Sequence, residues 1–289
     1  MVRSGVVGLC AALVCAAVPA SASVVPGPVF GEYVALGDSY AAGPLVPDAV
    51  RDAPAGCARS TGNYPSLLAR WLRVGSFTDV TCSGARTADL TGPQVFRSGT
   101  NPPQLAAVTS STDLVTLTIG GNDVGFGEIV ATCAREGSKD PAGDLCTRYY
   151  ARPGSDVLTE RVNEVAERVT EVLRTIHRTA PRAKVVLVGY PRILPEGAGC
   201  WPRVPFAAGD SAYFDAVERR LNAALARAAA DTLTDYVDPY RYGVGRDACA
   251  DPAVRWVEPI AARNPALALH PNAGGMAAVA ALTWVAARR

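Results

Sequence analysis

Short hydrophobic runs alternate with longer helical patterns along the chain. Five runs rich in Val, Leu, Ile, Tyr or Thr have the length and composition of buried strands. They cover residues 33–36, 78–82, 114–119, 184–188 and 234–237. Their alternation with helical segments predicts an α/β protein with a parallel sheet covered on both faces.

Two stretches between these runs have the periodicity of amphipathic helices. Apolar residues recur at three- and four-residue steps, and polar side chains fill the other face of the first helix. The first stripe is Leu158, Val162, Val165, Val169, Val172 and Ile176, and the second is Phe214, Val217, Leu221, Leu225 and Ala228. Asp210 or Ser211 is the expected N-cap of the second helix, and an Ala-rich segment, 273–287, predicts a closing helix. We interpret these stripes as core packing.

Four longer stretches have no regular pattern. They cover residues 41–63, 131–156, 190–208 and 240–269, and each contains a cysteine or directly precedes one. Long irregular segments in a compact domain are usually functional or tied down. We therefore expect them to form the walls of a binding site.

The first residues resemble an export signal. Arg3 precedes an apolar run over residues 6–18, and a small-residue cleavage site follows at 20–22. The run is short for a membrane anchor, and no later stretch is long and apolar enough to span a bilayer. We predict a signal peptide over residues 1–22 and a single soluble, secreted, extracellular domain over residues 23–289, with no stable membrane anchor and a monomeric state.

Charge narrows the choice of partners. Loss of the signal removes Arg3 and no acidic residue, so the rest of the chain has a formal charge of zero, and it has no basic run. This pattern gives no electrostatic support for nucleic-acid binding.

Cysteine usage agrees with export. Outside the signal the chain keeps six cysteines, an even number that favours disulfides in a secreted protein. They are Cys57, Cys82, Cys133, Cys146, Cys200 and Cys249. Six cysteines allow 15 pairings, of which pairing between neighbours is the simplest. A zinc site is disfavoured because the chain has no CxxC motif and only two histidines.

The residues just beyond the strands carry the candidate chemistry, because ligands of open parallel sheets bind at the carboxyl ends of the strands. Ser39 follows the first strand and Gly37, in the order expected for an exposed hydroxyl on a tight turn. The alternative is that Ser39 caps a helix. The segment is not the GxSxG elbow, since Ala41 stands where that motif has its last glycine.

Two glycine-containing segments follow the next strands. Gly84 lies beyond the second strand, and Gly120, Gly121 and Asn122 lie beyond the third. These residues could present a backbone N–H and a side-chain amide to a ligand, or they could form ordinary turns. A phosphate site is disfavoured because neither GxGxxG nor a following Lys-Ser/Thr is present.

The chain offers two imidazoles. His177 lies near the end of the first amphipathic helix, where a cation is favoured by the helix dipole, and we interpret it as structural. His270 lies in a loop just before the closing helix. It is the candidate general base near neutral pH.

The order of these signals resembles the SGNH, or GDSL, hydrolase superfamily, whose four named residues match Ser39, Gly84, Asn122 and His270. The strings LGDSY, CSGART, LTIGGND and LVGYPR resemble its secreted actinobacterial lipase and esterase branch, and the likeness spans about residues 32–288. The resemblance implies a three-layer, flavodoxin-like fold with a five-stranded parallel sheet. It also implies the disulfides Cys57–Cys82, Cys133–Cys146 and Cys200–Cys249.

One position departs from the common family pattern. Many members carry an Asp three residues before the histidine, where this chain has Leu267. By likeness to some secreted members, the backbone carbonyl of Leu267 would orient His270 instead. Asp238, Asp247 and Asp251 remain alternative carboxylate partners.

The resemblance implies a serine carboxylic ester hydrolase that acts on small-molecule or lipid esters, with fatty-acid esters as the expected class, and that needs no metal or organic cofactor. Ser39 would attack the ester carbonyl with His270 as base, and an oxyanion hole would consist of the Ser39 and Gly84 amides and the Asn122 side chain. Activity is expected to fall below about pH 6 as an imidazole protonates. The alternatives are a carbohydrate acetyl esterase or phospholipase on the same scaffold, a non-catalytic binding module, and a structural surface protein.

Overall fold

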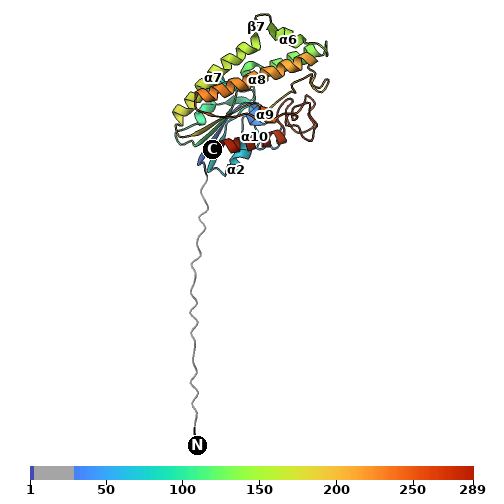
Figure 1. Ribbon diagram of the computed structural model, residues 1–289. Helices are drawn as coiled ribbons and strands as arrows, with labels where there is room; N and C mark the ends of the chain where they lie inside the picture. The colour runs from blue at the N-terminus through green and yellow to red at the C-terminus, as the bar shows by residue number, and fades with distance from the viewer. Residues whose placement is uncertain (3–28) are drawn as a thin grey trace.

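The computed structural model describes residues 1–2 and 29–289 (Figure 1). Most of the predicted signal peptide, residues 3–22, therefore lies outside the described residues. No helix in the described part of the chain has the length and apolar composition needed to cross a bilayer.

A five-stranded, fully parallel sheet forms the centre of the fold. Its strands lie in the order β2 (Ser76–Asp79), β1 (Glu32–Gly37), β5 (Leu114–Thr118), β8 (Lys184–Val188) and β9 (Asp235–Val237). The predicted parallel sheet is confirmed. The second strand starts and ends two to three residues earlier than predicted. The amides of Val80 and Cys82 still donate to the carbonyls of Ala35 and Gly37, so the chain stays beside β1 up to Cys82.

The two faces of the sheet carry separate hydrophobic clusters. Val34 and Leu36 of β1 pack in the cluster that contains the apolar stripes of α7 (Val157–Thr179) and α8 (Ala208–Asp231). Tyr33 and Ala35 of the same strand pack in the cluster with α2 (Tyr64–Leu72) and α10 (Ala273–Ala287). Alternate residues of one strand thus face opposite helical layers, and Figure 1 shows these layers on either side of the sheet. This is the predicted three-layer arrangement.

The long helices match the predicted stripes, with one change at the start of α8. The N-cap of α8 is Ala207, not Asp210 or Ser211. Asp210 is fully buried within the helix, and its carboxylate accepts hydrogen bonds from the amides of Cys146 and Thr147. A side chain that was expected to cap its own helix therefore anchors a neighbouring one.

Several short elements lie in stretches without a clear pattern. The segment 131–156, expected to be irregular, contains the end of α5 (Phe126–Gly137), all of α6 (Leu145–Tyr150) and a small hairpin. The remaining elements are α1 (Ser39–Ala42), η1 (Ala55–Cys57), α3 (Ala88–Thr91), β3 (Gln94–Phe96), β4 (Gly99–Asn101), η2 (Gln104–Ala107), α4 (Gly121–Val124), β6 (Ala151–Arg152), β7 (Ser155–Asp156) and α9 (Pro239–Tyr242). Short helices escape periodicity analysis because they span too few turns to show a stripe.

The six cysteines form the three disulfides that the family resemblance implied. The pairs are Cys57–Cys82, Cys133–Cys146 and Cys200–Cys249. The first fixes the segment just beyond β2, the second joins α5 to α6, and the third connects the segments after β8 and α9. Disulfides thus tie the loops that surround the carboxyl ends of the strands.

Candidate active site

Ser39 lies at the carboxyl end of β1, on a turn that depends on glycine. Gly37 has φ +145°, and a Cβ at this position would lie 2.5 Å from the carbonyl oxygen of Thr118 on the neighbouring strand. Asp38, not Ser39, caps the short helix α1, because its carboxylate accepts a 2.9 Å hydrogen bond from the Tyr40 amide. The capping role considered for Ser39 is therefore filled by its neighbour.

His270 lies next to Ser39, although 231 positions separate them in the sequence. Its Nε2 is 2.8 Å from the Ser39 hydroxyl oxygen, and its Nδ1 is 2.8 Å from the carbonyl oxygen of Ala268. A carbonyl oxygen only accepts hydrogen bonds, so Nδ1 carries the proton of the neutral imidazole. Nε2 is then the acceptor for the Ser39 hydroxyl, which is the arrangement that a general base requires.

The carbonyl that accepts from the His270 ring is that of Ala268. This corrects the role expected for the Leu267 carbonyl. The Leu267 carbonyl accepts a 3.0 Å hydrogen bond from the backbone amide of His270 instead. Leu269 has φ +58°, and this left-handed residue closes a tight turn. The Leu267 carbonyl is used by the backbone hydrogen bond of this turn. The Ala268 carbonyl is left to accept from the ring.

No carboxylate of the described residues contacts the His270 ring. The three aspartates considered from the sequence bind nearby backbone amides: Asp238 accepts from Arg241, Asp247 from Cys249 and Asp251 from Ala253. The imidazole is thus oriented by a neutral dipole and by packing against Tyr40, whose ring centroid lies 4.8 Å away.

Gly84 and Asn122 line the same cavity as Ser39 and His270. Gly84 has φ +77°, and its amide, like that of Ser39, has no acceptor among the described residues. The Asn122 side-chain nitrogen donates one hydrogen bond, 3.0 Å long, to the carbonyl oxygen of Ala85. An amide nitrogen carries two protons, so one remains for a ligand. The four residues predicted from the sequence therefore come together, while their roles in catalysis stay predictions.

Hydrogen bonds tie the loops of the site to one another. The Asp123 carboxylate accepts from the amide and hydroxyl of Thr87, which joins the segment after β5 to the segment after β2. The Tyr40 hydroxyl donates a 2.6 Å hydrogen bond to the carbonyl of Leu269, which joins α1 to the His270 turn. These side chains fix the distances between groups that come from different strands.

Tyr190 and Gln104 support the site and were not identified from the sequence. The Tyr190 hydroxyl donates to Asp38 and accepts from the Gly121 amide. Gln104 bonds both the amide and the carbonyl of Gly37. Tyr190 lies two residues beyond β8, within the string LVGYPR, and this position after the fourth strand is its signal in the sequence. Gln104 begins η2 and follows none of the five strands of the parallel sheet, so it carries no such signal.

Burial shifts the ionisation of two groups in the site. Desolvation lowers the pKa of His270 to about 4, despite an opposing hydrogen bond to the Ala268 carbonyl. Desolvation also raises the pKa of Asp38 to about 7, against hydrogen bonds from Tyr190 and the Tyr40 amide. The imidazole is therefore held in the neutral form that can accept a proton.

A cavity of about 290 Å³ opens beside the Ser39 hydroxyl. Much of its wall is apolar, with contributions from α5, α8 and the loops after β8 and α9. These side chains are Phe126, Val130, Ile193, Phe214, Ile260 and Leu267. A hydroxyl, a neutral base and free N–H donors beside an apolar wall can perform acyl transfer on a hydrophobic substrate.

The second histidine, His177, lies apart from this cavity. His177, in the last turn of α7, is not among its lining residues, and its Nε2 lies 2.9 Å from the Thr234 hydroxyl. Among residues 1–2 and 29–289, no group of three or more Cys, His, Asp and Glu side chains is arranged to hold a metal ion.

Comparison of the sequence with known families gives a match to the GDSL-like lipase/acylhydrolase family over residues 35–278. The chain is 40% identical to a Streptomyces coelicolor protein named Lipase 2, over 84% of this chain and 81% of that protein. It is 33% identical to a Streptomyces scabiei esterase, over 78% of this chain and 74% of the esterase.

Comparison of the fold gives two similar crystal structures. A phospholipase A1 from Streptomyces albidoflavus superposes with a TM-score of 0.69 and 28% identity, covering 89% of this chain and 98% of the enzyme. An extracellular lipase from Streptomyces rimosus superposes with a TM-score of 0.68 and 29% identity, covering 88% and 97%.

Proposed function

The chain belongs to the GDSL-like lipase/acylhydrolase family and is a carboxylic ester hydrolase, and we propose that it cleaves fatty-acid esters through an acyl-enzyme on Ser39. The observation that carries this proposal is the 2.8 Å distance between His270 Nε2 and Ser39 Oγ. The proton on Nδ1, held by the Ala268 carbonyl, leaves Nε2 free to act as the base.

In the first half-reaction, His270 takes the hydroxyl proton as Ser39 Oγ attacks the ester carbonyl carbon. The tetrahedral intermediate collapses, the imidazolium gives its proton to the leaving alcohol oxygen, and the acyl group stays on Ser39. Water then attacks the acyl-enzyme with the same imidazole as base, and release of the acid restores the Ser39 hydroxyl. Each proton that leaves a nucleophile passes to a leaving oxygen.

The negative charge that forms on the carbonyl oxygen would be stabilised by three donors. They are the backbone amides of Ser39 and Gly84 and the remaining side-chain N–H of Asn122. Donors fixed before the reaction act most strongly on charge that appears only in the transition state. The free amides of the first two residues and their shared cavity with Asn122 support this assignment.

The apolar wall of the cavity supports a fatty acyl chain as the substrate group beside Ser39. Phospholipase activity is the second candidate, favoured by the superposition with the phospholipase A1. A lipid ester would place its acyl chain against Phe126 and Phe214, and its alcohol or glycerol portion toward solvent.

The proposal includes secretion and a single domain. The extracellular lipase that superposes on the chain, the three disulfides and the N-terminal sequence pattern support an extracellular location. Residues 23–289 would form the mature protein, acting as a monomer.

The direct test is the variant Ser39→Ala. Turnover of a nitrophenyl ester is expected to fall to background, while the circular dichroism spectrum stays that of the wild type. A fluorophosphonate probe should label the wild-type protein on Ser39 and leave the variant unlabelled. Ser110→Ala, at an exposed serine away from the site, is the matched control and should keep both properties. Full esterase activity in Ser39→Ala would exclude the proposed nucleophile.

The substrate group is tested separately with a panel of purified substrates. Nitrophenyl esters of increasing acyl length, phosphatidylcholine and acetylated xylan should be compared at equal enzyme concentration. Higher kcat/KM for longer acyl esters than for the acetyl ester is expected from the apolar wall. A preference for acetylated xylan would contradict a fatty acyl substrate.

A further inference from the structure

The turn that carries His270 pairs with the segment around Glu258. The backbone amide of Glu258 donates a 3.1 Å hydrogen bond to the carbonyl of His270, and the Leu269 amide donates a 2.9 Å bond to the carbonyl of Glu258. Val257 and Pro271 form an isolated antiparallel bridge beside them. The backbone of Glu258 therefore holds the two residues that set the direction of the imidazole.

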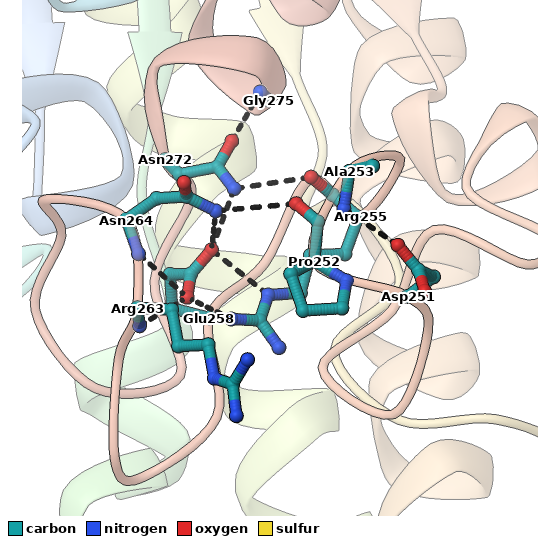
Figure 2. A network of polar contacts seen from close by, with 9 residues as sticks. All are labelled: Asp251, Pro252, Ala253, Arg255, Glu258, Arg263, Asn264, Asn272 and Gly275. Atoms are coloured by element: carbon teal, nitrogen blue, oxygen red, sulfur yellow. Dashed lines mark hydrogen bonds and ion pairs between the residues drawn. The ribbon is translucent and has the colours of Figure 1, made fainter.

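The side chain of Glu258 is fully buried and receives donors on both oxygens (Figure 2). The Arg255 guanidinium binds both, with distances of 2.9 and 2.5 Å. The backbone amides of Arg263 and Asn264 bind one oxygen, and the side-chain amides of Asn264 and Asn272 bind the other. Burial raises the pKa of Glu258, but these donors outweigh it and hold the pKa at about 2. The carboxylate is thus ionised wherever an ester hydrolase with a histidine base works.

Asn272 connects this carboxylate to the His270 segment from the other side. Its side-chain nitrogen donates 2.8 Å to Glu258 Oε1 and 3.0 Å to the carbonyl of Arg255. Its side-chain oxygen accepts from the Gly275 amide and caps α10. Glu258 therefore holds His270 from two sides. Its backbone pairs with that of His270, and its carboxylate binds Asn272, the N-cap of α10.

We propose that Glu258 is a positioning residue for the general base, holding the His270 turn so that Nε2 stays within hydrogen-bond distance of Ser39. This inference rests on the proposed function, because it gives Glu258 a role through the Ser39–His270 pair. In the described part of the chain no carboxylate orients the imidazole directly. The carboxylate instead fixes the position of Glu258, whose backbone amide and carbonyl hold His270 and Leu269.

The energetic reason is that the His270 turn has no regular structure, so individual hydrogen bonds hold it in place. The Tyr40 hydroxyl holds the Leu269 carbonyl from the side of Ser39, and the Glu258 network holds the opposite side. Removal of one partner from a buried ion pair leaves the other charge uncompensated, so Arg255 would draw in water or move. A displacement of about 1 Å between base and nucleophile can reduce the rate on the order of 100-fold.

The test is Glu258→Gln in the full chain, with kcat, KM and the pH profile of kcat/KM measured on a nitrophenyl ester. We expect kcat to fall on the order of 10- to 100-fold with little change in KM. We also expect the acid limb of the profile to move to higher pH, because a loosened turn exposes His270 to water and relieves the desolvation that lowers its pKa. The groups that face the imidazole are Ser39 and Tyr40, and the charged group that faces Glu258 is Arg255.

A second variant keeps the test valid if Glu258→Gln fails to fold. Asn272→Ser retains a side-chain oxygen that can cap α10 but removes the donors to Glu258 and Arg255. It should shift kcat and the acid limb in the same direction by a smaller factor. Glu167→Gln, at an exposed glutamate of α7, controls for loss of one negative charge and should match the wild type.

The outcomes separate this inference from the proposed function. Wild-type kcat and an unchanged acid limb in folded Glu258→Gln or Asn272→Ser would overturn the positioning role while fluorophosphonate labelling of Ser39 still stood. A fall in thermal stability with an unchanged acid limb would also overturn it, since a purely structural residue would give that pattern. Absence of Ser39 labelling in the wild type would instead remove the proposed function itself.

Discussion

The Tyr190 hydroxyl donates a 2.5 Å hydrogen bond to the buried carboxylate of Asp38. The same hydroxyl accepts a 2.8 Å bond from the Gly121 amide. Asp38 directly precedes Ser39, and Gly121 directly precedes Asn122. One phenol therefore fixes the segment of the proposed nucleophile relative to the segment of a proposed oxyanion donor.

Tyr190→Phe should weaken both stability and catalysis. The change leaves the Asp38 carboxylate and the Gly121 amide with one partner fewer in a buried site, which costs about 1–3 kcal/mol of unfolding free energy. We expect kcat to fall on the order of tenfold as the two segments lose their common anchor. Urea unfolding and steady-state kinetics measure the two effects. Tyr149→Phe, at an exposed tyrosine, is the control, and equal behaviour of the two variants would contradict the anchoring role.

Asn122→Ala should lower kcat far more than it raises KM. The second N–H of the side chain is proposed to bind the oxyanion, which exists only after attack, so its loss acts on the transition state. A loss of about 10²–10³-fold in kcat is typical for one such donor. Asn163→Ala, at an exposed asparagine of α7, should have wild-type kinetics. A higher KM with unchanged kcat would show that Asn122 only binds the substrate.

Leu267→Ala should be much milder than His270→Ala. The Leu267 side chain is 39% exposed and lines the cavity, and alanine keeps both the backbone carbonyl at this position and the neighbouring Ala268 carbonyl. We expect kcat to be nearly unchanged, with a higher KM for long acyl chains, whereas His270→Ala loses the base. Kinetics on short and long nitrophenyl esters distinguish the two. Comparable losses of kcat would mean that the Leu267 side chain itself orients the imidazole.

The pH dependence should differ from that of an exposed histidine. The base must be neutral to take the Ser39 proton, and desolvation lowers the pKa of His270 to about 4. The active form therefore persists as pH falls, and the acid limb of kcat/KM is expected near pH 4 instead of below pH 6, as an unperturbed imidazole would give. The profile should be measured from pH 3.5 to 9, with circular dichroism at each pH to verify that the protein is folded. Half-maximal kcat/KM near pH 6.5 would show that His270 is not desolvated in the free enzyme.

Removal of the Cys57–Cys82 disulfide should affect the site as well as stability. Cys82 lies two residues before Gly84, and the Ser83 amide donates to the Cys57 carbonyl. The double variant Cys57→Ala/Cys82→Ala should lose about 2–4 kcal/mol of unfolding free energy and also show reduced kcat, because the Gly84 amide is less well fixed. Cys133→Ala/Cys146→Ala, which separates α5 from α6, should lose similar stability with a smaller effect on kcat. Equal kinetic effects of the two pairs would mean that the first disulfide has no particular link to Gly84.

The sequence by itself determined the parallel sheet, the long helices that cover its two faces, and the identity of the four residues that meet beyond the strands. Strand and helix periodicity depends on alternate burial along a local segment, so β8 and α10 were predicted at their observed bounds. The order of Ser39, Gly84, Asn122 and His270 along the chain carried the family resemblance, and a parallel sheet brings strand ends to one edge.

Only the tertiary structure decided which groups complete the site. The carbonyl beside His270 belongs to Ala268 and not Leu267, because a left-handed residue at Leu269 sets the direction of each carbonyl in the turn. Tyr190 contacts Asp38 and Gly121, which are far away in the sequence. Glu258 binds residues of its own irregular segment, whose hydrogen bonds follow no helix or strand periodicity. Periodicity reports which side of a segment is buried, while hydrogen bonds between loops depend on how the whole chain folds.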